Sequence, residues 1–384
     1  MLQAGVLEGA FALTNLYLSC NIITNVEDGV FKNSTALEKL ILSRNEIASV
    51  NNATFRGAIV LQHLDLSGNK LVTVPAEALR HVCGLKHLYL EMNSLITVPE
   101  DCFSSLSMLV HLDLSENKLT TLQEGSLRGL TMLSELDLSL NLIASLPSKV
   151  FDDLICLKSL DLYRNRLTSL SLETFGLTHL KELKLSHNQL HNIPFNTFYL
   201  LYNLRKLVLK NNKLDSLHSQ LFAQLLKLTE LNLDGNRLSD LHPNVFKGLT
   251  SLQILSLKSN QLRAVESGTL GFLRNISAVY LSGNLWDCTC TRVVYISTWA
   301  NTHRDKLKDQ PTCFFSPATC CATNMTKDVA SAKLIRNIII FIIFITDQYQ
   351  FLIEILILLR YLNIRSLCLS LLYSSSSIQH LSVF

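Results

Sequence analysis

The chain has 384 residues, with 34 lysines and arginines against 31 aspartates and glutamates, so its formal net charge is only +3. Its basic residues are scattered and form no run of the kind that follows a phosphate backbone, so we expect no nucleic-acid partner. A chain of this length ordinarily predicts two or three globular domains, but an internal repeat overrides that expectation.

The chain begins inside a repeating unit. Gly5-Val6-Leu7 matches Gly29-Val30-Phe31 one unit later, so Met1 falls partway through the first unit. No charged start followed by an apolar run and a small-residue cleavage site is visible, which means that no signal peptide is recognisable. An uncovered first coil would expose a strand edge and half of its apolar core. We therefore expect this chain, or its gene model, to be truncated at the start.

Twelve copies of the pattern LxxLxLxxN follow one another through residues 1–284. Their asparagines lie 24 residues apart, except for one step of 23 residues before Asn188, where a residue is missing between Phe175 and Leu180. A fixed period in this range predicts a solenoid, in which each coil buries its apolar side against its neighbours. The twelve asparagines are Asn21, Asn45, Asn69, Asn93, Asn117, Asn141, Asn165, Asn188, Asn212, Asn236, Asn260 and Asn284.

The pattern also predicts the structure of one coil. Leu88 and Leu90 are two residues apart, so both point to one side of a short strand while Tyr89 between them faces outward. A phenylalanine or leucine farther along each coil, such as Phe103, closes the back of the core. The asparagine offers both a donor and an acceptor to the turning backbone, which predicts a buried structural ladder.

These repeats resemble the extracellular leucine-rich repeat family, in its typical class with 24-residue units that contain phenylalanine. The resemblance covers about residues 5–330. It implies an α/β solenoid: a curved horseshoe with a parallel β-sheet on the concave face and irregular or short helical segments on the convex face. It also implies an extracellular protein, because receptor ectodomains and serum carrier subunits are among the family's members. Four cysteines occupy unrelated positions in the coils, and we expect buried free thiols at Cys20, Cys83, Cys102 and Cys156.

The outward-facing strand positions form columns along the predicted concave face. Three histidines recur on successive coils, and acidic and aromatic residues stand beside them. The histidine column has three interpretations: a metal site, a pH-sensitive contact patch, or a solvated face with no role. We expect a partner-binding strip suited to a basic protein, because exposed aromatic residues often anchor interfaces. The candidate residues are Tyr17, His63, Asp65, His87, Tyr89, His111, Asp113, Asp137, Asp161 and Tyr163.

The segment 285–333 ends the repeats. Asn284-Leu285-Trp286-Asp287-Cys288-Thr289-Cys290 resembles the family's cysteine-rich C-terminal cap, although Leu285 replaces its usual proline. A helix over 293–299 would let Ile296 and Trp299 cover the last coil. The resemblance implies a Cys288–Cys313 disulfide and a second one between Cys290 and either Cys320 or Cys321. The glycosylation sequons at Asn33, Asn52, Asn275 and Asn324 agree with a secretory route.

Residues 334–384 form an apolar tail of low complexity. Its first apolar run, 338–345, is too short to span a bilayer, and Asp347 and Glu354 would be costly inside one. A membrane anchor, translated non-coding sequence and an extension of the cap are the three interpretations that stay open.

No catalytic motif is present in the repeats, so we expect neither enzymatic activity nor a cofactor. The first hypothesis is an extracellular protein-binding module or receptor ectodomain that uses its concave face. The second is a structural or carrier protein of matrix or serum that stabilises a partner enzyme. A fragmentary gene product is the third. Fold analogy predicts neither the ligand nor the oligomeric state.

Overall fold

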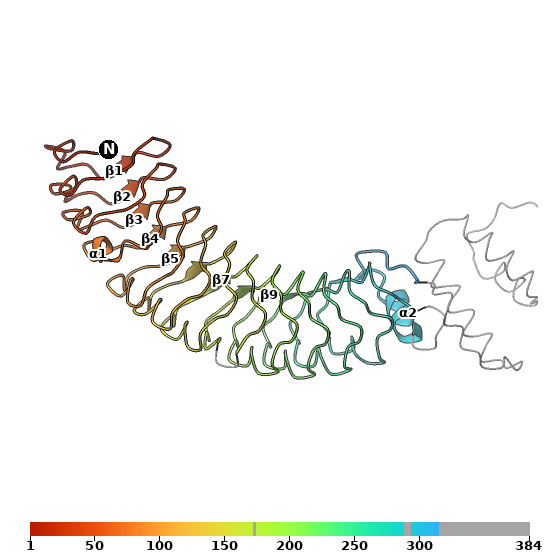
Figure 1. Cartoon of the computed structure of the whole chain (residues 1–384). Coiled ribbons are helices and arrows are strands. Elements are labelled where there is room, and N and C mark those ends of the chain that lie inside the picture. Colours follow the sequence, from red (N-terminus) through yellow and green to blue (C-terminus); the bar gives the residue numbers. More distant parts are fainter. Residues whose placement is uncertain (172–173, 288–292, 315–384) are drawn as a thin grey trace, which may run out of the picture.

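The computed structural model describes residues 1–171, 174–287 and 293–314 as an arc of stacked coils (Figure 1). One parallel sheet of twelve strands runs along the inner side of the arc, in the order in which the strands occur in the sequence. The strands are β1 (Asn15–Tyr17), β2 (Lys39–Ile41), β3 (His63–Asp65), β4 (His87–Tyr89), β5 (His111–Asp113), β6 (Glu135–Asp137), β7 (Ser159–Asp161), β8 (Glu182–Lys184), β9 (Lys206–Val208), β10 (Glu230–Asn232), β11 (Ile254–Ser256) and β12 (Ala278–Tyr280). The predicted solenoid with a concave parallel sheet is confirmed.

Each strand is three residues long, and every strand pairs with the next without a register shift. His63 pairs with His87, and His87 pairs with His111. The central leucine of a strand points inward, whereas its two neighbours face the concave surface. Columns of outward-facing side chains therefore run across the sheet, as the sequence predicts.

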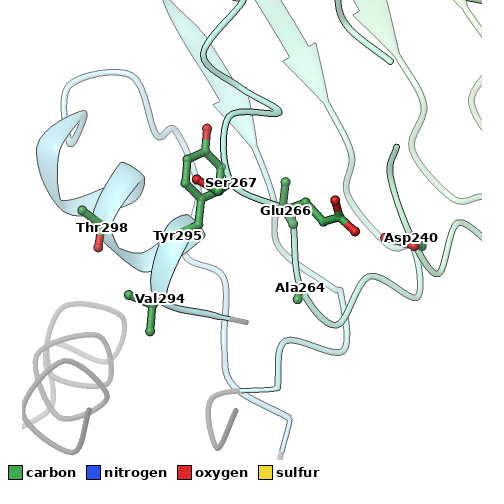
Figure 2. Close-up of a pocket in the computed structure, with 8 residues that line it drawn as sticks. Asp240, Ala264, Glu266, Ser267, Val294, Tyr295 and Thr298 are labelled. Carbon is green, nitrogen blue, oxygen red and sulfur yellow. The ribbon is translucent and has the colours of Figure 1, made fainter. Parts of the chain in front are cut away.

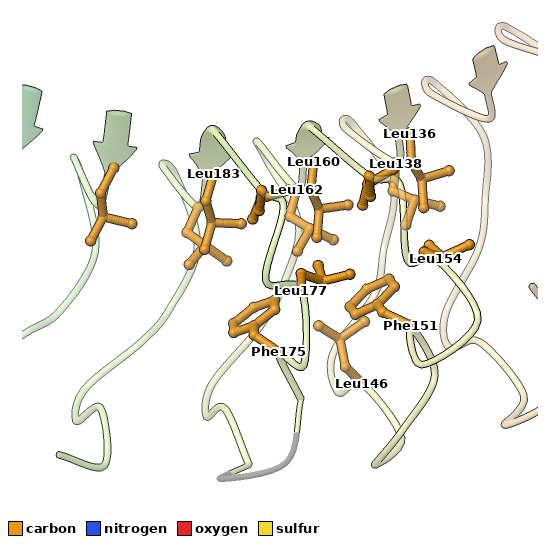
Figure 3. Packing of buried hydrophobic residues seen from close by; sticks show 14 of the residues in the cluster. Leu136, Leu138, Leu146, Phe151, Leu154, Leu160, Leu162, Phe175, Leu177 and Leu183 are labelled. Carbon is orange, nitrogen blue, oxygen red and sulfur yellow. The ribbon is translucent and has the colours of Figure 1, made fainter. Parts of the chain in front are cut away.

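The core lies between the sheet and the back of the coils. Figure 3 shows strand leucines such as Leu136 and Leu160 above Phe151 and Phe175, all of them almost fully buried. The two phenylalanine rings are nearly parallel, with centroids 6.1 Å apart. Burying a leucine or phenylalanine side chain stabilises a fold by about 1.5–3 kcal/mol. Each coil brings several such side chains, and these stabilise the solenoid only where a neighbouring coil covers them.

The asparagine ladder connects the coils through hydrogen bonds. Asn93 donates from Nδ2 to the carbonyl oxygens of Leu90 (3.1 Å) and of Leu66 in the preceding coil (3.0 Å). Its Oδ1 accepts from the backbone N–H of Leu71 at 3.0 Å. The eleven asparagines from Asn45 to Asn284 are buried, which confirms their structural role. Asn21 in the first coil is exposed and donates to carbonyl groups of its own coil.

The residue before each ladder asparagine has a positive φ in all twelve coils. Gly68 has a φ of 62°, a conformation that costs glycine little, whereas Leu140 adopts a φ of 56° despite its side chain. This left-handed residue turns the chain into the coil directly after the strand, where the asparagine amide can reach the freed backbone groups.

The 23-residue unit is accommodated on the back of the coil. Leu177 follows Phe175 by two residues, whereas Leu154 follows Phe151 by three, and both leucines are buried. On the concave side β7 and β8 stay in register, with Ser159 opposite Glu182. The shorter unit therefore leaves the concave surface continuous.

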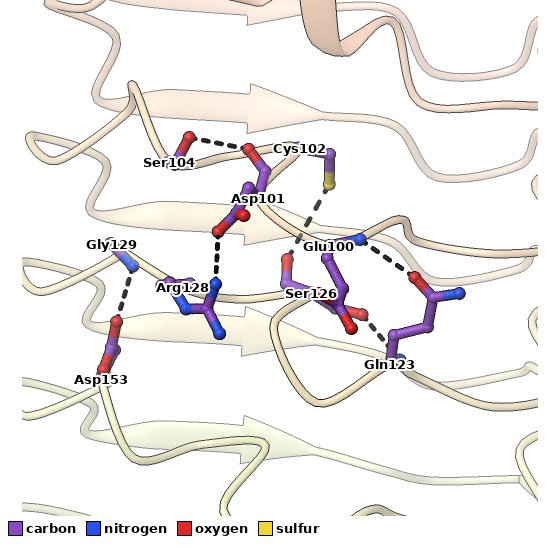
Figure 4. Close-up of polar contacts among 9 residues, drawn as sticks. All are labelled: Glu100, Asp101, Cys102, Ser104, Gln123, Ser126, Arg128, Gly129 and Asp153. Atoms are coloured by element: carbon purple, nitrogen blue, oxygen red, sulfur yellow. Dashed lines mark hydrogen bonds and ion pairs between the residues drawn. The ribbon is translucent and has the colours of Figure 1, made fainter.

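In the described residues, the backs of the coils consist of turns and one short helix, α1 (Ala76–Leu79). Polar side chains link neighbouring coils there: Arg128 lies 2.9 Å from Asp101, and the backbone N–H of Gly129 donates to Asp153 at 2.8 Å (Figure 4). Within one coil, Ser126 Oγ accepts from the backbone N–H of Gln123 at 2.7 Å. These contacts satisfy backbone groups that no regular element pairs.

The thiols of the solenoid only partly follow the sequence prediction. Cys102 is buried and Cys156 is half-buried, but Cys20 and Cys83 are exposed, so the prediction of buried thiols is wrong for these two. Cys20 is the left-handed residue of its coil, with a φ of 58°, and Cys83 lies in the turn that precedes β4. The leucine pattern identifies buried columns, and neither cysteine belongs to one.

The C-terminal end of the solenoid is covered. The helix α2 (Val293–Thr302) buries Ile296 and Trp299 against the last coil, as predicted. Val279 of β12 exchanges hydrogen bonds with Lys306 and Lys308, and the Asp309 carboxylate accepts from the N–H groups of Leu281 and Ser282. The edge of β12 is therefore paired.

The N-terminal edge differs from this end. Leu16 and Leu18 of the first coil are only half-buried, whereas the matching leucines of the inner coils are fully buried. The assigned cap cysteines Cys288, Cys290 and Cys320, together with Cys321, lie outside the described residues, so the disulfide pairing stays a prediction. The apolar tail also lies outside them. Within the described part, no helix has the length and hydrophobicity required to cross a bilayer.

Candidate functional site on the concave face

The concave face carries its aspartates in a column that also has a structural role. Oδ1 of Asp65 accepts from the backbone N–H of Ser67 at 2.9 Å. Asp113 and Asp137 make the same bond to the N–H two residues on, at 2.8 Å, and Asn232 makes it at 3.0 Å. Each side chain therefore closes a local turn as its strand ends. Asparagine is sufficient for this bond, so the negative charge of the aspartates is not required by the fold.

The acidic strip is stacked as predicted, but its charge is uneven. Asp113, Asp137 and Asp161 lie opposite one another on β5, β6 and β7. Asp161 is neutralised by Lys184, whose Nζ lies 2.8 Å from Oδ2. Burial raises the pKa of the Asp137 carboxyl, and the charges of Asp161 and Asp113 raise it further. Among the aspartates of the strip, Asp113 therefore differs from Asp161, which already has a lysine partner.

Four aromatic rings form a continuous array on β3, β4 and β5. The Tyr89 ring centroid lies 5.0 Å from that of His63 and 5.0 Å from that of His111, with interplanar angles of 45° and 40°. The His87 ring lies 5.5 Å from His63 and 6.2 Å from His111. The three histidines and Tyr89 therefore make one surface, which we call the aromatic shelf.

Two of the three histidines of the shelf, His63 and His87, are held toward their neutral form. Burial lowers the pKa of His63 below its ordinary value, and the positive charge of Lys39 adds to this effect. Burial likewise lowers the pKa of His87, with a further contribution from His111. Nδ1 of His111 lies 3.1 Å from Oε2 of Glu135. His63 and His87 thus favour uncharged rings, and His111 contacts a carboxylate.

Glu91 is a functional candidate that the sequence prediction missed. It follows β4 at a position where Ser67 and Ser115 stand in the adjacent coils. Its Oε2 is buried and has no hydrogen-bond partner among the described residues. Burial raises the pKa of its carboxyl to about 7, and the negative charges of Asp113 and Asp65 act in the same direction. The sequence did offer one indication of this site, because a glutamate at position 91 interrupts a column of serines.

The remaining sequence candidates lie apart from the shelf. Tyr17 stands on the edge strand β1, and Tyr163 follows β7, so the structure does not bring either of them to His63, Asp65, His87, Tyr89, His111 and Asp113. No group of three His, Cys, Asp or Glu side chains in the described part of the chain could hold a metal ion. The metal interpretation of the histidines therefore receives no support from the geometry.

The concave face beyond β7 is different because its charges are paired within the chain. Lys206 on β9 lies 3.7 Å from Glu182 and 3.4 Å from Glu230. The ammonium group of Lys258 lies over the Tyr280 ring, 5.3 Å from its centroid. This half of the sheet supplies its own counter-charges.

A pocket of about 650 Å³ lies at the other end of the molecule, between the last coils and α2 (Figure 2). Asp240 and Glu266 line it together with apolar side chains, and Val294 and Thr298 close it from the helix. The Tyr295 hydroxyl accepts from the backbone N–H of Leu270 at 3.1 Å, so it holds α2 against the solenoid. We assign no ligand to this pocket.

The sequons can be located in three cases. Asn33, Asn52 and Asn275 are exposed, and Asn324 lies outside the described residues. The side chain of Asn275 donates to the carbonyl oxygen of Thr250 at 2.7 Å. Exposure is what glycosylation requires, and whether glycans are attached stays a prediction.

Comparison with known proteins identifies the fold family. The family model described as leucine rich repeat matches residues 11–71, 83–143, 131–190, 178–238 and 226–285, which together make up more than half of the chain. The chain belongs to the leucine rich repeat family. A search of curated proteins gave no match.

Solved structures of leucine-rich repeat proteins are similar to this chain. TLR13 in its complex with ssRNA13 is 30% identical, with a TM-score of 0.65, over 77% of this chain and 46% of its own. Toll of Drosophila in its glycosylated complex with Spatzle is 26% identical, with a TM-score of 0.70, over 76% and 39%. The leucine-rich repeat domain of APL1B is 25% identical, with a TM-score of 0.63, over 81% and 86%. This chain thus spans less than half of the TLR13 and Toll chains.

Proposed function

We propose that this leucine-rich repeat protein is a non-enzymatic, extracellular binding module or receptor ectodomain that engages a basic protein ligand with its concave face. The observation that carries the proposal is the aromatic shelf with its surrounding carboxylates on β3–β5. Rigid aromatic side chains contribute large contact areas at protein interfaces and lose little conformational entropy. A parallel sheet holds them in fixed positions, so binding would require little rearrangement.

The similar structures support a protein ligand. Toll is in complex with the protein Spatzle, so a protein with this fold binds a protein partner. TLR13 is in complex with ssRNA13, so the absence of a nucleic-acid partner stays a prediction for this chain. The acidic surroundings of the shelf favour a protein ligand, because carboxylates would repel a phosphate backbone.

Site-directed photo-crosslinking tests this proposal. A photoreactive phenylalanine analogue would replace Ser159 on β7, facing the concave side, and in a matched protein Glu124 on the exposed back of a coil. Both proteins would be irradiated in extracellular fluid from the source tissue. We expect one defined adduct from position 159 and none from position 124. Adducts from position 124 alone would contradict binding through the concave face.

The captured ligand then provides the quantitative test. Its affinity would be measured by surface plasmon resonance at low and at high salt. A basic ligand should bind more weakly as salt screens the carboxylates of the concave face. An affinity that does not depend on salt would contradict the predicted charge of the ligand.

A further inference from the structure

Four tyrosines stand on the concave face, and three of them have a basic side chain over the ring. Lys39 lies 5.6 Å from the ring centroid of Tyr17, and Lys258 lies 5.3 Å from that of Tyr280. Arg164 lies 5.3 Å from the ring centroid of Tyr163. These distances are typical of cation–π contacts. The described residues supply no such cation to the fourth tyrosine, Tyr89.

The surroundings of Tyr89 are nevertheless suited to a cation. The His63 and His111 rings hold the Tyr89 ring from two sides, each at 5.0 Å between centroids. Asp65 and Asp113 lie opposite Tyr89 on the two neighbouring strands. Glu91 lies two residues farther along the chain, just after the end of β4. An aromatic ring bordered by three carboxylates attracts a positive charge through both the ring face and the acids.

We propose that Tyr89 seats one arginine side chain of the protein ligand, with Glu91, Asp65 and Asp113 as the carboxylates that receive its charge. This inference rests on the proposed function, because the arginine belongs to the ligand that the concave face binds. Arginine fits better than lysine because its planar guanidinium group stacks on an aromatic ring and still donates several hydrogen bonds at its edge.

The burial and the raised pKa of the Glu91 carboxyl agree with a site that binds a cation. Its Oε2 is buried without a hydrogen-bond partner among the described residues, and burial raises the pKa of its carboxyl to about 7. A guanidinium ion would stabilise the ionised carboxylate, so binding would release a proton from Glu91. Binding should therefore become stronger as the pH rises through 7.

The charged neighbours act in the same direction. His63 and His87, whose pKa values are lowered by burial, are neutral at pH 8 and gain positive charge in acid, where they would repel a cation. The ionised fraction of Glu91 falls about tenfold between pH 8 and pH 6, given a pKa of about 7. The charges that act on Glu91 itself are those of Asp65 and Asp113 on the two neighbouring strands. The other titratable or charged groups around the shelf act on its histidines: His63, Lys86, His87 and His111, with Lys39 and Glu135 one strand farther out on either side.

The test uses a small arginine probe and the whole chain. Acetyl-Gly-Arg-Gly-amide would be titrated into protein labelled with ¹³C at the histidine rings, and its neutral counterpart with citrulline in place of arginine would be titrated in parallel. The chain has 11 histidines, which single replacements would assign in the NMR spectrum. We expect saturable shifts of the His63 and His111 signals with arginine and not with citrulline. The affinity should be about tenfold weaker at pH 6 than at pH 8.

Three variants separate the site from the rest of the concave face. Glu91→Ser introduces the residue of the adjacent coils, and Tyr89→Val introduces the residue found at Val208 in the same column, so both should fold. Each should weaken the arginine probe at pH 8 by about tenfold or more, and Glu91→Ser should also remove most of the pH dependence. Glu230→Gln, on β10, is the matched control and should leave binding unchanged.

Several results would overturn the inference: equal shifts with arginine and citrulline, an affinity that rises toward pH 6, or equal effects of Glu91→Ser and Glu230→Gln. If the probe fails while position 159 still crosslinks to a ligand, the arginine seat is wrong and the proposed function stands. If crosslinks arise only from position 124, the proposed function fails, whatever the probe does.

Discussion

The two halves of the concave face share one backbone and differ in how their charges are compensated. On β8–β10 lysines and glutamates pair with each other. A single lysine, Lys206, contacts both Glu182 and Glu230. On β3–β5 the rings of the aromatic shelf pack together, while Glu91 has a buried oxygen with no partner among the described residues. A surface that satisfies its own charges gains little from a ligand, whereas unpaired groups gain more when a ligand supplies the partner. The difference therefore supports the proposal that the ligand binds on β3–β5.

The largest expected effect is the loss of stability when a ladder asparagine is replaced. It should be the same in both halves of the concave face, because both contain the ladder. Asn117 donates to Leu90 and Leu114 and accepts from Leu95, and Asn236 makes the equivalent three bonds in its coil. Replacing either asparagine by alanine leaves buried backbone groups unpaired, which should cost about 3 kcal/mol of stability. Urea unfolding followed by circular dichroism measures this loss. A much smaller loss at Asn117 than at Asn236 would show that the halves also differ in their scaffold.

The next effect concerns ligand affinity. Asp65→Asn combined with Asp113→Asn removes charge beside the shelf and keeps the local turns, since Asn232 makes the same bond. We expect the ligand identified by crosslinking to bind about tenfold more weakly, and its affinity to depend less on salt. Asp161→Asn combined with Lys184→Gln is the control, because it removes both members of an ion pair, keeps the net charge and should change the affinity little. Equal losses from both changes would remove the distinction between the halves.

A smaller effect concerns the stability of the free protein. The pKa of Glu91 is raised to about 7 from the ordinary value of 4.5, so its ionisation lowers stability as the pH rises from 4.5 to 7. This cost is complete above pH 7 and absent below pH 4.5. Glu91→Ser should raise stability at pH 8 by about 1 kcal/mol, after allowance for the solvent contact of a half-buried group, and by nothing at pH 4. Thermal unfolding of both proteins at the two pH values checks this. A gain that does not depend on pH would contradict the assigned ionisation.

The smallest effect is expected in the paired half. Lys206 and its partners Glu182 and Glu230 are all about a third exposed, so solvent screens their attraction. Lys206→Gln should change stability by less than about 0.5 kcal/mol. Urea unfolding provides the measurement, and a loss of several kcal/mol would show that these ion pairs do more than compensate charge.

Much of the fold could be predicted from the sequence because every coil repeats the same constraints. Leu88 and Leu90 define one strand face, and Asn93 marks the turn that follows, so the period determines the register of the sheet. The helix that covers the last coil was predictable from Ile296 and Trp299, which have no leucine column to join. The local sequence pattern is enough to predict the fold wherever one coil resembles the next.

The site was only partly predictable, for a physical reason. The columns placed His63, Tyr89 and His111 on successive strands. Whether Oε2 of Glu91 finds a partner depends on side-chain rotamers and on burial by neighbours, which no column reveals. The neutralisation of Asp161 by Lys184 likewise depends on a contact between coils. Sequence identifies which residues face the concave side, and three-dimensional packing decides which of them remain available.

Carboxylate footprinting tests directly whether the ligand covers β3–β5. The protein would be treated with a carbodiimide and glycinamide, with and without the crosslinked ligand, and the modification of each acid would be measured by mass spectrometry. We expect the ligand to protect Asp65, Glu91 and Asp113, while Glu182 and Glu230 are modified to the same extent in both samples. Protection of Glu182 and Glu230 with unchanged labelling at Asp65, Glu91 and Asp113 would contradict this expectation.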